Sequence, residues 1–222
     1  MSYTLAIMKL INDPDGFFAE MRSHEVKLSK PALIVLLLAI LVALNQYILI
    51  AKLSEAMPQK LEVFFKIGGY IGIAGSFVGM FAIWLIIAVI MHGLSAFFDG
   101  EGNFRRTFEF VGYGFTPSLV GSAITVPMLI NHISKAKIPK IDILSLQHNP
   151  NLVREVVLML IPAEIIYSNM VINLAITAWS LTIWTFAVKH ARGLELRQAF
   201  TCALIPTALF GIYQLWSILK LL

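Results

Sequence analysis

The sequence predicts an all-α polytopic membrane protein, a bundle of five transmembrane helices with an N-terminal interfacial helix. Three observations indicate this class. The chain of 222 residues is 58% hydrophobic and only 14% charged, whereas soluble domains carry about 25% charged residues. Its mean hydropathy is +0.80, too apolar for one small water-soluble core. Its apolar residues also gather into runs of about 20, the length that crosses a bilayer as a helix.

Residues 1–30 form a mixed, charged segment that we expect to be cytoplasmic or interfacial. Asp15 is placed to cap a short helix that begins near Gly16, with Phe17 and Phe18 on one side of it. That side is expected to lie against the bilayer. The alternative is a disordered tail with a few apolar residues. The segment has no basic start and no clear cleavage site, so it is not predicted to be a signal peptide.

Five apolar stretches follow and form the predicted transmembrane domain, residues 31–222. Pro31 suits the first turn of a helix, where no backbone N–H donor is needed. The second stretch is longer than the bilayer core, so we expect it to tilt or to project into the headgroups. The loop 131–164 contains an apolar part near 152–164, which is predicted as a re-entrant helix, an interfacial helix or an extension of the fourth span. The predicted spans are 31–51, 67–98, 110–130, 165–188 and 199–219.

Lysine and arginine residues fall almost equally on the two sides of these spans. With the N-terminus inside, nine lie in inner segments and eight in outer segments, of 17 in the chain. Two clusters in very short loops favour a cytoplasmic N-terminus. They are Arg105 with Arg106, and Lys189 with Arg192 and Arg197. The net charge of +4 fits cations in the headgroup zones. No basic and aromatic residues interleave as on a nucleic-acid surface, so no nucleic-acid partner is expected.

The stretch "GNFRRTFEFVGYGFTPSLVG", residues 102–121, joins the second and third spans. Arg105 and Arg106 are expected to meet lipid headgroups, with neighbouring phenylalanines as interfacial anchors. A membrane helix accepts glycines and a proline where neighbours satisfy the freed carbonyls, and small residues allow another helix to come close. The anchors are Phe104, Phe108 and Phe110, and the expected helix-packing positions are Gly112, Gly114 and Pro117.

This stretch resembles the signature of the Ypt-interacting protein (Yip) family of small multi-span proteins, in which a "GY…P" element opens the third of five spans. Gly112, Tyr113 and Pro117 carry that element here. The N-terminal "INDPDGFFAEMR", the glycine-rich second span and the end "ARGLELRQAF…IPTAL" are similar to prokaryotic members. The long cytosolic domain and the Asp-Leu-Tyr-Gly-Pro motif of eukaryotic members are missing. The resemblance therefore implies a prokaryotic-type member in a cell membrane, and binding of a Rab-type GTPase is not expected.

The second span carries two series of small residues at intervals of four. Such series allow close contact between helices. One hypothesis is that this face mediates self-association or contact with another membrane protein. The alternative is that it packs against other spans of the same chain. The two series are Gly68, Gly72 and Ser76, and Gly75 and Gly79.

Five polar side chains in or near the spans would form a polar path if they faced one another. Ionisable groups at membrane depth are costly and therefore mark candidate functional sites. The alternative is that the ionisable pair lies near the interfaces while the amides bond across helices. The five side chains are Asn45, His92, Glu164, Asn169 and Asn173.

No enzyme motif is present: the sequence has no zinc-protease His pair, nucleophile elbow, phosphate loop or dinucleotide fingerprint. His132 and His148 have no evident third ligand, so neither a metal nor a cofactor is predicted. Cys202 lies in an apolar run and is expected to be a packing residue. The leading hypothesis is a non-enzymatic membrane scaffold that acts in membrane organisation or trafficking. The alternative is a small transporter or channel that uses the polar path.

Overall fold

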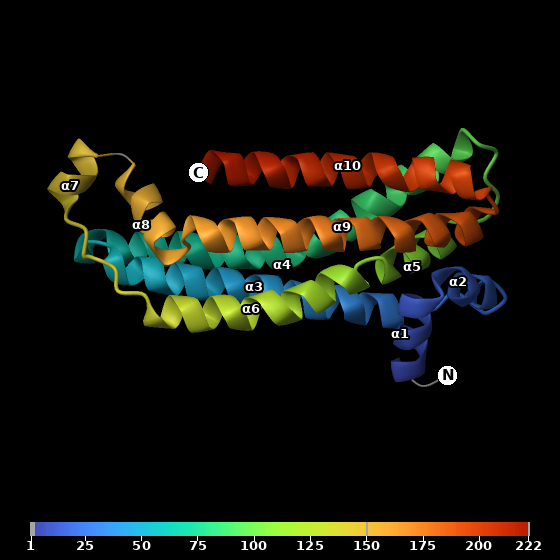
Figure 1. Ribbon diagram of the computed structural model, residues 1–222, viewed down its shortest axis with the longest axis horizontal. Helices are drawn as coiled ribbons and strands as arrows, with labels where there is room; N and C mark the ends of the chain where they lie inside the picture. The colour runs from blue at the N-terminus through green and yellow to red at the C-terminus, as the bar shows by residue number, and fades with distance from the viewer. Residues whose placement is uncertain (1–2, 150, 222) are drawn as a thin grey trace.

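The computed structural model describes residues 3–149 and 151–221, which are entirely helical apart from turns and connections (Figure 1). The predicted all-α class is confirmed. The long helices run side by side, and the turns gather at two ends. The helices are α1 (Tyr3–Asn12), α2 (Pro14–Arg22), α3 (Ser29–Ala56), α4 (Gln59–Ala96), α5 (Phe104–Tyr113), α6 (Thr116–Lys135), α7 (Ile143–His148), α8 (Leu152–Leu160), α9 (Ala163–Arg192) and α10 (Leu196–Leu221).

Four segments in the described part of the chain are long and apolar enough to cross a membrane. They are α3, α4, the pair α5–α6 taken together, and α9. In α10 the apolar stretch Leu196–Ile212 is shorter than this criterion requires. The fifth span therefore stays a prediction, although α10 lies alongside α9 and α4 (Figure 1).

The two ends of the bundle differ, and we call them proximal and distal. The proximal end, on the right in Figure 1, holds α1, α2 and the turns that lead into α5 and α10. The distal end, on the left, holds the α3–α4 turn, α7 and α8. The main core lies toward the proximal end, where α2, α3, α4, α5 and α9 meet. Its largest fully buried side chains include Phe18, Met91 and Phe110.

Helix α2 buries the aromatic residues that we expected to lie against the bilayer. Phe17 is 3% exposed and Phe18 is not exposed at all. The Phe18 ring lies 4.9 Å from that of Phe110, and the Phe17 ring 5.2 Å from that of Tyr113. The expectation of a lipid-facing aromatic side is wrong for α2, because an aromatic cleft of the bundle receives these rings. Helix α1 does expose apolar side chains, including Met8, and its interfacial location stays a prediction.

The start of α2 is fixed by Asp13, one residue before Pro14, rather than by Asp15. The Asp13 carboxylate accepts a hydrogen bond of 2.9 Å from the Gly16 N–H, the usual geometry of a helix N-cap. Asp15 instead lies 2.6 Å from both Lys189 Nζ and His190 Nε2 of α9. The hydrogen bond from Lys189, followed by that from His190, lowers the pKa of Asp15 below its ordinary value. These contacts therefore tie α2 to the end of α9.

The distal connection contains two short helices, α7 and α8. A separate cluster buries Val156 and Leu160 of α8 against residues such as Leu53 and Ile133. Residues Ile161 and Pro162 separate α8 from α9, so α8 is not an extension of the fourth span. The description of α8 as either a re-entrant or an interfacial helix stays a prediction.

Candidate functional site

The third span is broken where the signature element lies. Helix α5 ends at Tyr113 and α6 begins at Thr116. Two hydrogen bonds between residues three apart cross the break, from Gly114 N–H to Val111 O at 3.0 Å and from Phe115 N–H to Gly112 O at 3.3 Å. Pro117 stands in the first turn of α6, where its missing N–H costs nothing. The break thus joins a short amphipathic helix to a longer apolar one.

Two tryptophans of neighbouring helices donate to carbonyls just before the break. Trp184 Nε1–H of α9 donates to Val111 O, and Trp84 Nε1–H of α4 donates to Phe108 O, each at 2.9 Å. The Trp84 ring also stacks on Phe108 with 3.9 Å between ring centroids. Both indoles are buried, so each N–H needs a partner and each carbonyl gains one. The α5 backbone is therefore clamped between α4 and α9.

Glycine is the residue that lets these indoles approach. A Cβ atom on Gly114 would lie 2.0 Å from Trp184 Nε1. A Cβ on Gly112 would lie 2.6 Å from Pro31 Cβ and 2.9 Å from the Trp84 ring. These distances are shorter than any van der Waals contact. Neither position therefore accepts a larger residue unless the neighbouring side chains move.

Arg106 and Glu109 form a buried ion pair that fastens the N-terminal segment to α5. Arg106 Nη1 donates to Glu109 Oε2 at 2.7 Å and to Met21 O at 3.2 Å, and its Nη2 donates to His24 O. Glu109 Oε1 accepts from the Lys27 N–H at 2.9 Å. The Glu109 side chain is completely buried. The expectation that Arg106 meets lipid headgroups is thus wrong, because the turn between α2 and α3 covers it.

The expected phenylalanine anchors also lie inside the protein. Phe110 is completely buried, Phe108 stacks on Trp84, and Phe104 makes an edge-to-face contact with His92 at 5.4 Å. Arg105 is exposed and is still expected to meet headgroups. Phe104 and Phe108 lie on one face of α5, and Phe110 lies on nearly the opposite side against Phe18. Protein on two sides of α5 therefore covers the rings that were expected to form an interfacial belt.

Arg192, at the end of α9, makes hydrogen bonds that hold the turn between α4 and α5 at the proximal end. Its guanidinium donates to the carbonyls of Gly100 and Gly102, and its Nε donates to Ser95 Oγ at 2.7 Å. Gly102 has φ +108, in the region that favours glycine. From the sequence, Arg192 is only one charge of a basic loop. Its role depends on contacts between residues far apart in the sequence, which no local pattern reveals.

Three of the five predicted polar-path residues line one cavity. Asn45 of α3 and Asn169 and Asn173 of α9 surround about 220 Å³ together with Ser122 and Thr125 of α6. The Asn173 amide also donates to Asn169 O at 2.8 Å, so part of its hydrogen-bonding capacity is used within α9. The region is polar and large enough to hold water.

This asparagine cavity adjoins two others. Toward the distal end it shares Thr125 and Asn169 with a cavity of about 560 Å³ whose rim carries His132 and Lys135. Toward the proximal end it shares Ser122 and Asn173 with a narrower cavity of about 180 Å³, which reaches Trp184. The three cavities therefore follow one another through shared lining residues, from His132 on the distal side to Trp184 beside the break of the third span.

His92 and Glu164 do not line any of these three cavities. His92 lies near the proximal end, where its Nδ1 is 2.9 Å from Thr107 Oγ1. Glu164 is exposed in the first turn of α9. The hypothesis that all five residues face one another is therefore wrong, because the fold places His92 and Glu164 close to opposite ends of the bundle.

The glycine series of α4 faces away from the rest of the chain. A Cβ built on Gly68, Gly72, Gly75 or Gly79 meets no atom within 4 Å. At about 100° per residue these four positions fall within about 60° of one helix face. Among residues 3–149 and 151–221 as described, these four glycines make no close contact with another span, so the alternative of packing within the chain finds no support there.

Residues 3–149 and 151–221 contain no group of three or more His, Cys, Asp or Glu side chains placed to hold a metal ion. Cys202 is buried in the main core. The buried charges that sequence analysis missed, Glu109 and Arg192, each have partners that keep the fold together. Only the spacing of Arg106 and Glu109, three residues apart on α5, offered a sequence signal.

A helical bundle with several membrane-length segments and a glycine-proline break in the third of them defines a multi-pass integral membrane protein. Residues 8–218 match the model of the Yip1 domain, and the chain belongs to the Yip1 domain family. It is similar to an uncharacterised protein of the archaeon Methanocaldococcus jannaschii, with 37% identity over 122 residues that cover 55% of this chain and 86% of the relative. No solved structure matches the chain. The resemblance found in the sequence is thereby confirmed.

Proposed function

We propose that this Yip1-domain protein is a non-enzymatic scaffold that organises membrane proteins through the open glycine face of α4. The observation that carries the proposal is that Gly68, Gly72, Gly75 and Gly79 share one face, where a Cβ atom would meet no atom of another described element within 4 Å. Glycines cost helix stability relative to alanine, by about 1 kcal/mol each. A lipid-facing surface gains nothing from them, whereas a partner helix gains close backbone contact.

The ionisable groups near membrane depth support a structural role for the rest of the bundle. Glu109 binds Arg106, His92 pairs with Thr107, and Arg192 binds turn carbonyls. Each of these groups already has a partner that orders a turn or a helix contact. None of these three groups lies beside a cavity together with another side chain that could take part in catalysis. This supports a protein that catalyses no reaction of its own.

The test is self-association measured on the purified protein. We expect Gly72→Leu with Gly75→Leu to reduce the fraction of cross-linked or larger species in membranes and in mild detergent. Ala74→Leu is the matched control, because Ala74 is also exposed and lies about 130° around α4 from the centre of the glycine face. A glycine double variant that folds and keeps the same oligomers and the same cross-linked neighbours as the control overturns the proposal.

A second candidate function is transport of a small polar solute. The run of cavities around Asn45, Asn169 and Asn173 supports it. None of the three cavities is lined by described residues of the proximal turns. Transport is therefore the weaker candidate, since a path across the bundle needs an opening beside Trp184. A liposome flux assay tests it: wild-type flux of protons, cations or anions that Asn173→Leu abolishes supports transport, and zero flux refutes it for those solutes.

We further propose a prokaryotic cell-membrane location with the proximal end in the cytoplasm. The buried docking of the N-terminal segment and the short basic turns at this end support the orientation. A membrane-impermeant thiol reagent applied to intact cells checks it in a Cys202→Ala background. Ser134→Cys, exposed at the distal end, should react, and Ser23→Cys, exposed at the proximal end, should not. The reverse labelling refutes the orientation.

A further inference from the structure

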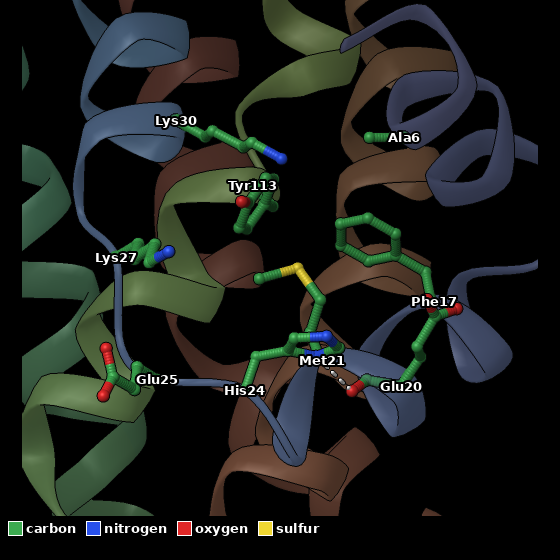
Figure 2. Close-up of a pocket in the computed structure, with 9 residues that line it drawn as sticks. All are labelled: Ala6, Phe17, Glu20, Met21, His24, Glu25, Lys27, Lys30 and Tyr113. Carbon is green, nitrogen blue, oxygen red and sulfur yellow. Dashed lines mark hydrogen bonds between the residues drawn. The ribbon is translucent and has the colours of Figure 1, made fainter. Parts of the chain in front are cut away.

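A cavity of about 480 Å³ opens beside the N-terminal segment at the proximal end of the bundle. Figure 2 shows Lys27, Lys30 and Tyr113 on one side of it and Phe17 and Met21 on the other. Lys27 lies just before α3 and Lys30 in its first turn. Because α3 is a membrane-length helix that begins here, the cavity lies at the level of lipid headgroups.

The charge around this cavity favours an anion. The Glu20 carboxylate is engaged by Lys9 at 2.5 Å, and in Figure 2 Glu20 lies across the cavity from the two lysines. In the described part of the chain, Lys27 makes no ion pair. Two lysines, Lys27 and Lys30, and two glutamates, Glu20 and Glu25, line the cavity. Because Lys9 from outside the lining neutralises Glu20, the remaining charge is that of two lysines against Glu25. A headgroup phosphate placed between the two ammonium groups would find positive charge on both sides.

The cavity continues into an apolar groove along the span. A second, smaller cavity of about 80 Å³ shares Phe17, Lys30 and Tyr113 with the first. It runs past Leu33 and Leu37 of α3, between α1 and α6. Leu33 and Leu37 are each more than 40% exposed, so the groove lies open to the bilayer. A polar compartment next to an apolar one matches a molecule with a charged head and a hydrocarbon tail.

We propose that this site binds one anionic phospholipid, with its phosphate between Lys27 and Lys30 and an acyl chain in the groove along α3. The α1–α2 segment forms one wall and docks on the bundle through Phe17, Phe18 and the Asp15–Lys189 pair. A bound lipid would therefore bridge this segment and the first span. The Tyr113 side chain of the signature element lines both compartments.

The experiment measures lipid retention by the purified full-length protein with native mass spectrometry. Phosphatidylglycerol and phosphatidylcholine with the same acyl chains are added in equal amounts. We expect one phosphatidylglycerol per chain to be retained at least about 10-fold over phosphatidylcholine. Lys27→Ala with Lys30→Ala should weaken phosphatidylglycerol binding about 30-fold, because each lysine near a membrane surface contributes a factor of about five. Inorganic phosphate should not compete, because it lacks the tail.

Matched controls keep the outcome decisive. Lys60→Ala with Lys140→Ala removes the same charge from exposed distal positions and should leave binding unchanged. Leu37→Trp fills the groove without altering charge and should weaken binding if an acyl chain lies there. Equal retention of the two lipids, an equal loss in the distal control, or full competition by phosphate overturns the proposal. The lipid comparison on the wild-type protein decides the case even if the lysine variant fails to fold.

Discussion

Replacing Gly114 by alanine should destabilise the bundle because the new Cβ occupies the position of the Trp184 indole. That Cβ would lie 2.0 Å from Nε1 and 2.1 Å from Cδ1 of Trp184. If the indole moves away, Val111 O loses a buried 2.9 Å hydrogen bond, at a cost of about 1–3 kcal/mol. Overpacking adds about 1–3 kcal/mol, and the better helix propensity of alanine returns up to about 1 kcal/mol. The expected loss in the free energy of unfolding is about 3 kcal/mol.

The matched control is Gly72→Ala, since its Cβ meets nothing within 4 Å. This substitution should stabilise α4 by up to about 1 kcal/mol. Unfolding in mixed micelles, followed by tryptophan fluorescence, compares the two variants with wild type. Trp184→Phe removes the indole N–H and part of the clash, so Gly114→Ala should cost less in that background. Equal stability of Gly114→Ala and Gly72→Ala would refute the clamp described above.

Three further predictions concern the charges at the proximal end. Glu109→Leu leaves the Arg106 guanidinium without its carboxylate and should cost about 3–5 kcal/mol, whereas Glu109→Gln, which keeps an acceptor, should cost less; chemical denaturation of both variants checks this. The pKa of Asp15 is lowered mainly by Lys189, so the pair stabilises α2 docking above the ordinary carboxyl pKa of 3.8 and the effect disappears as the pH falls through the lowered value. Hydrogen exchange in α2 should therefore rise in acid, by a modest factor because Asp15 is half exposed, and Asp15→Asn should remove the pH dependence. Arg192→Met strips both turn carbonyls of their donor and should make the turn between α4 and α5 sensitive to limited proteolysis, while a turn that resists protease as in wild type would contradict the assigned role.

Much of the signature region was predictable from sequence because its constraints are local. Glycine at 112 and 114 and proline at 117 indicate a break with close neighbours, and the structure identifies those neighbours as Trp84, Trp184 and Pro31. The chain alone does not say which tryptophan meets which carbonyl. Those partners come from α4 and α9, and their choice depends on how whole helices pack.

The polar path illustrates the opposite case. Asn169 and Asn173, four residues apart, share a helix face by geometry alone, and Asn45 joins them only because α3 and α9 both border α6 there. His92 and Glu164 are as polar and as close to the spans in sequence, but they lie near opposite ends of the bundle. Depth along a helix follows from its true ends, which sequence patterns place only within several residues.

The sequence by itself determined that this chain is a helical membrane protein of the Yip1 domain family, because hydrophobic length and the glycine-proline element are properties of consecutive residues. Only the tertiary structure decided that Phe17 and Phe18 are core residues, that Arg106 is buried with Glu109, and that the α4 glycines face outward. Those outcomes depend on which helix covers which face. A periodic pattern indicates that one face of a helix is apolar or has small side chains. Such a face can contact either lipid or protein, and the packing of the helices decides which of the two it contacts.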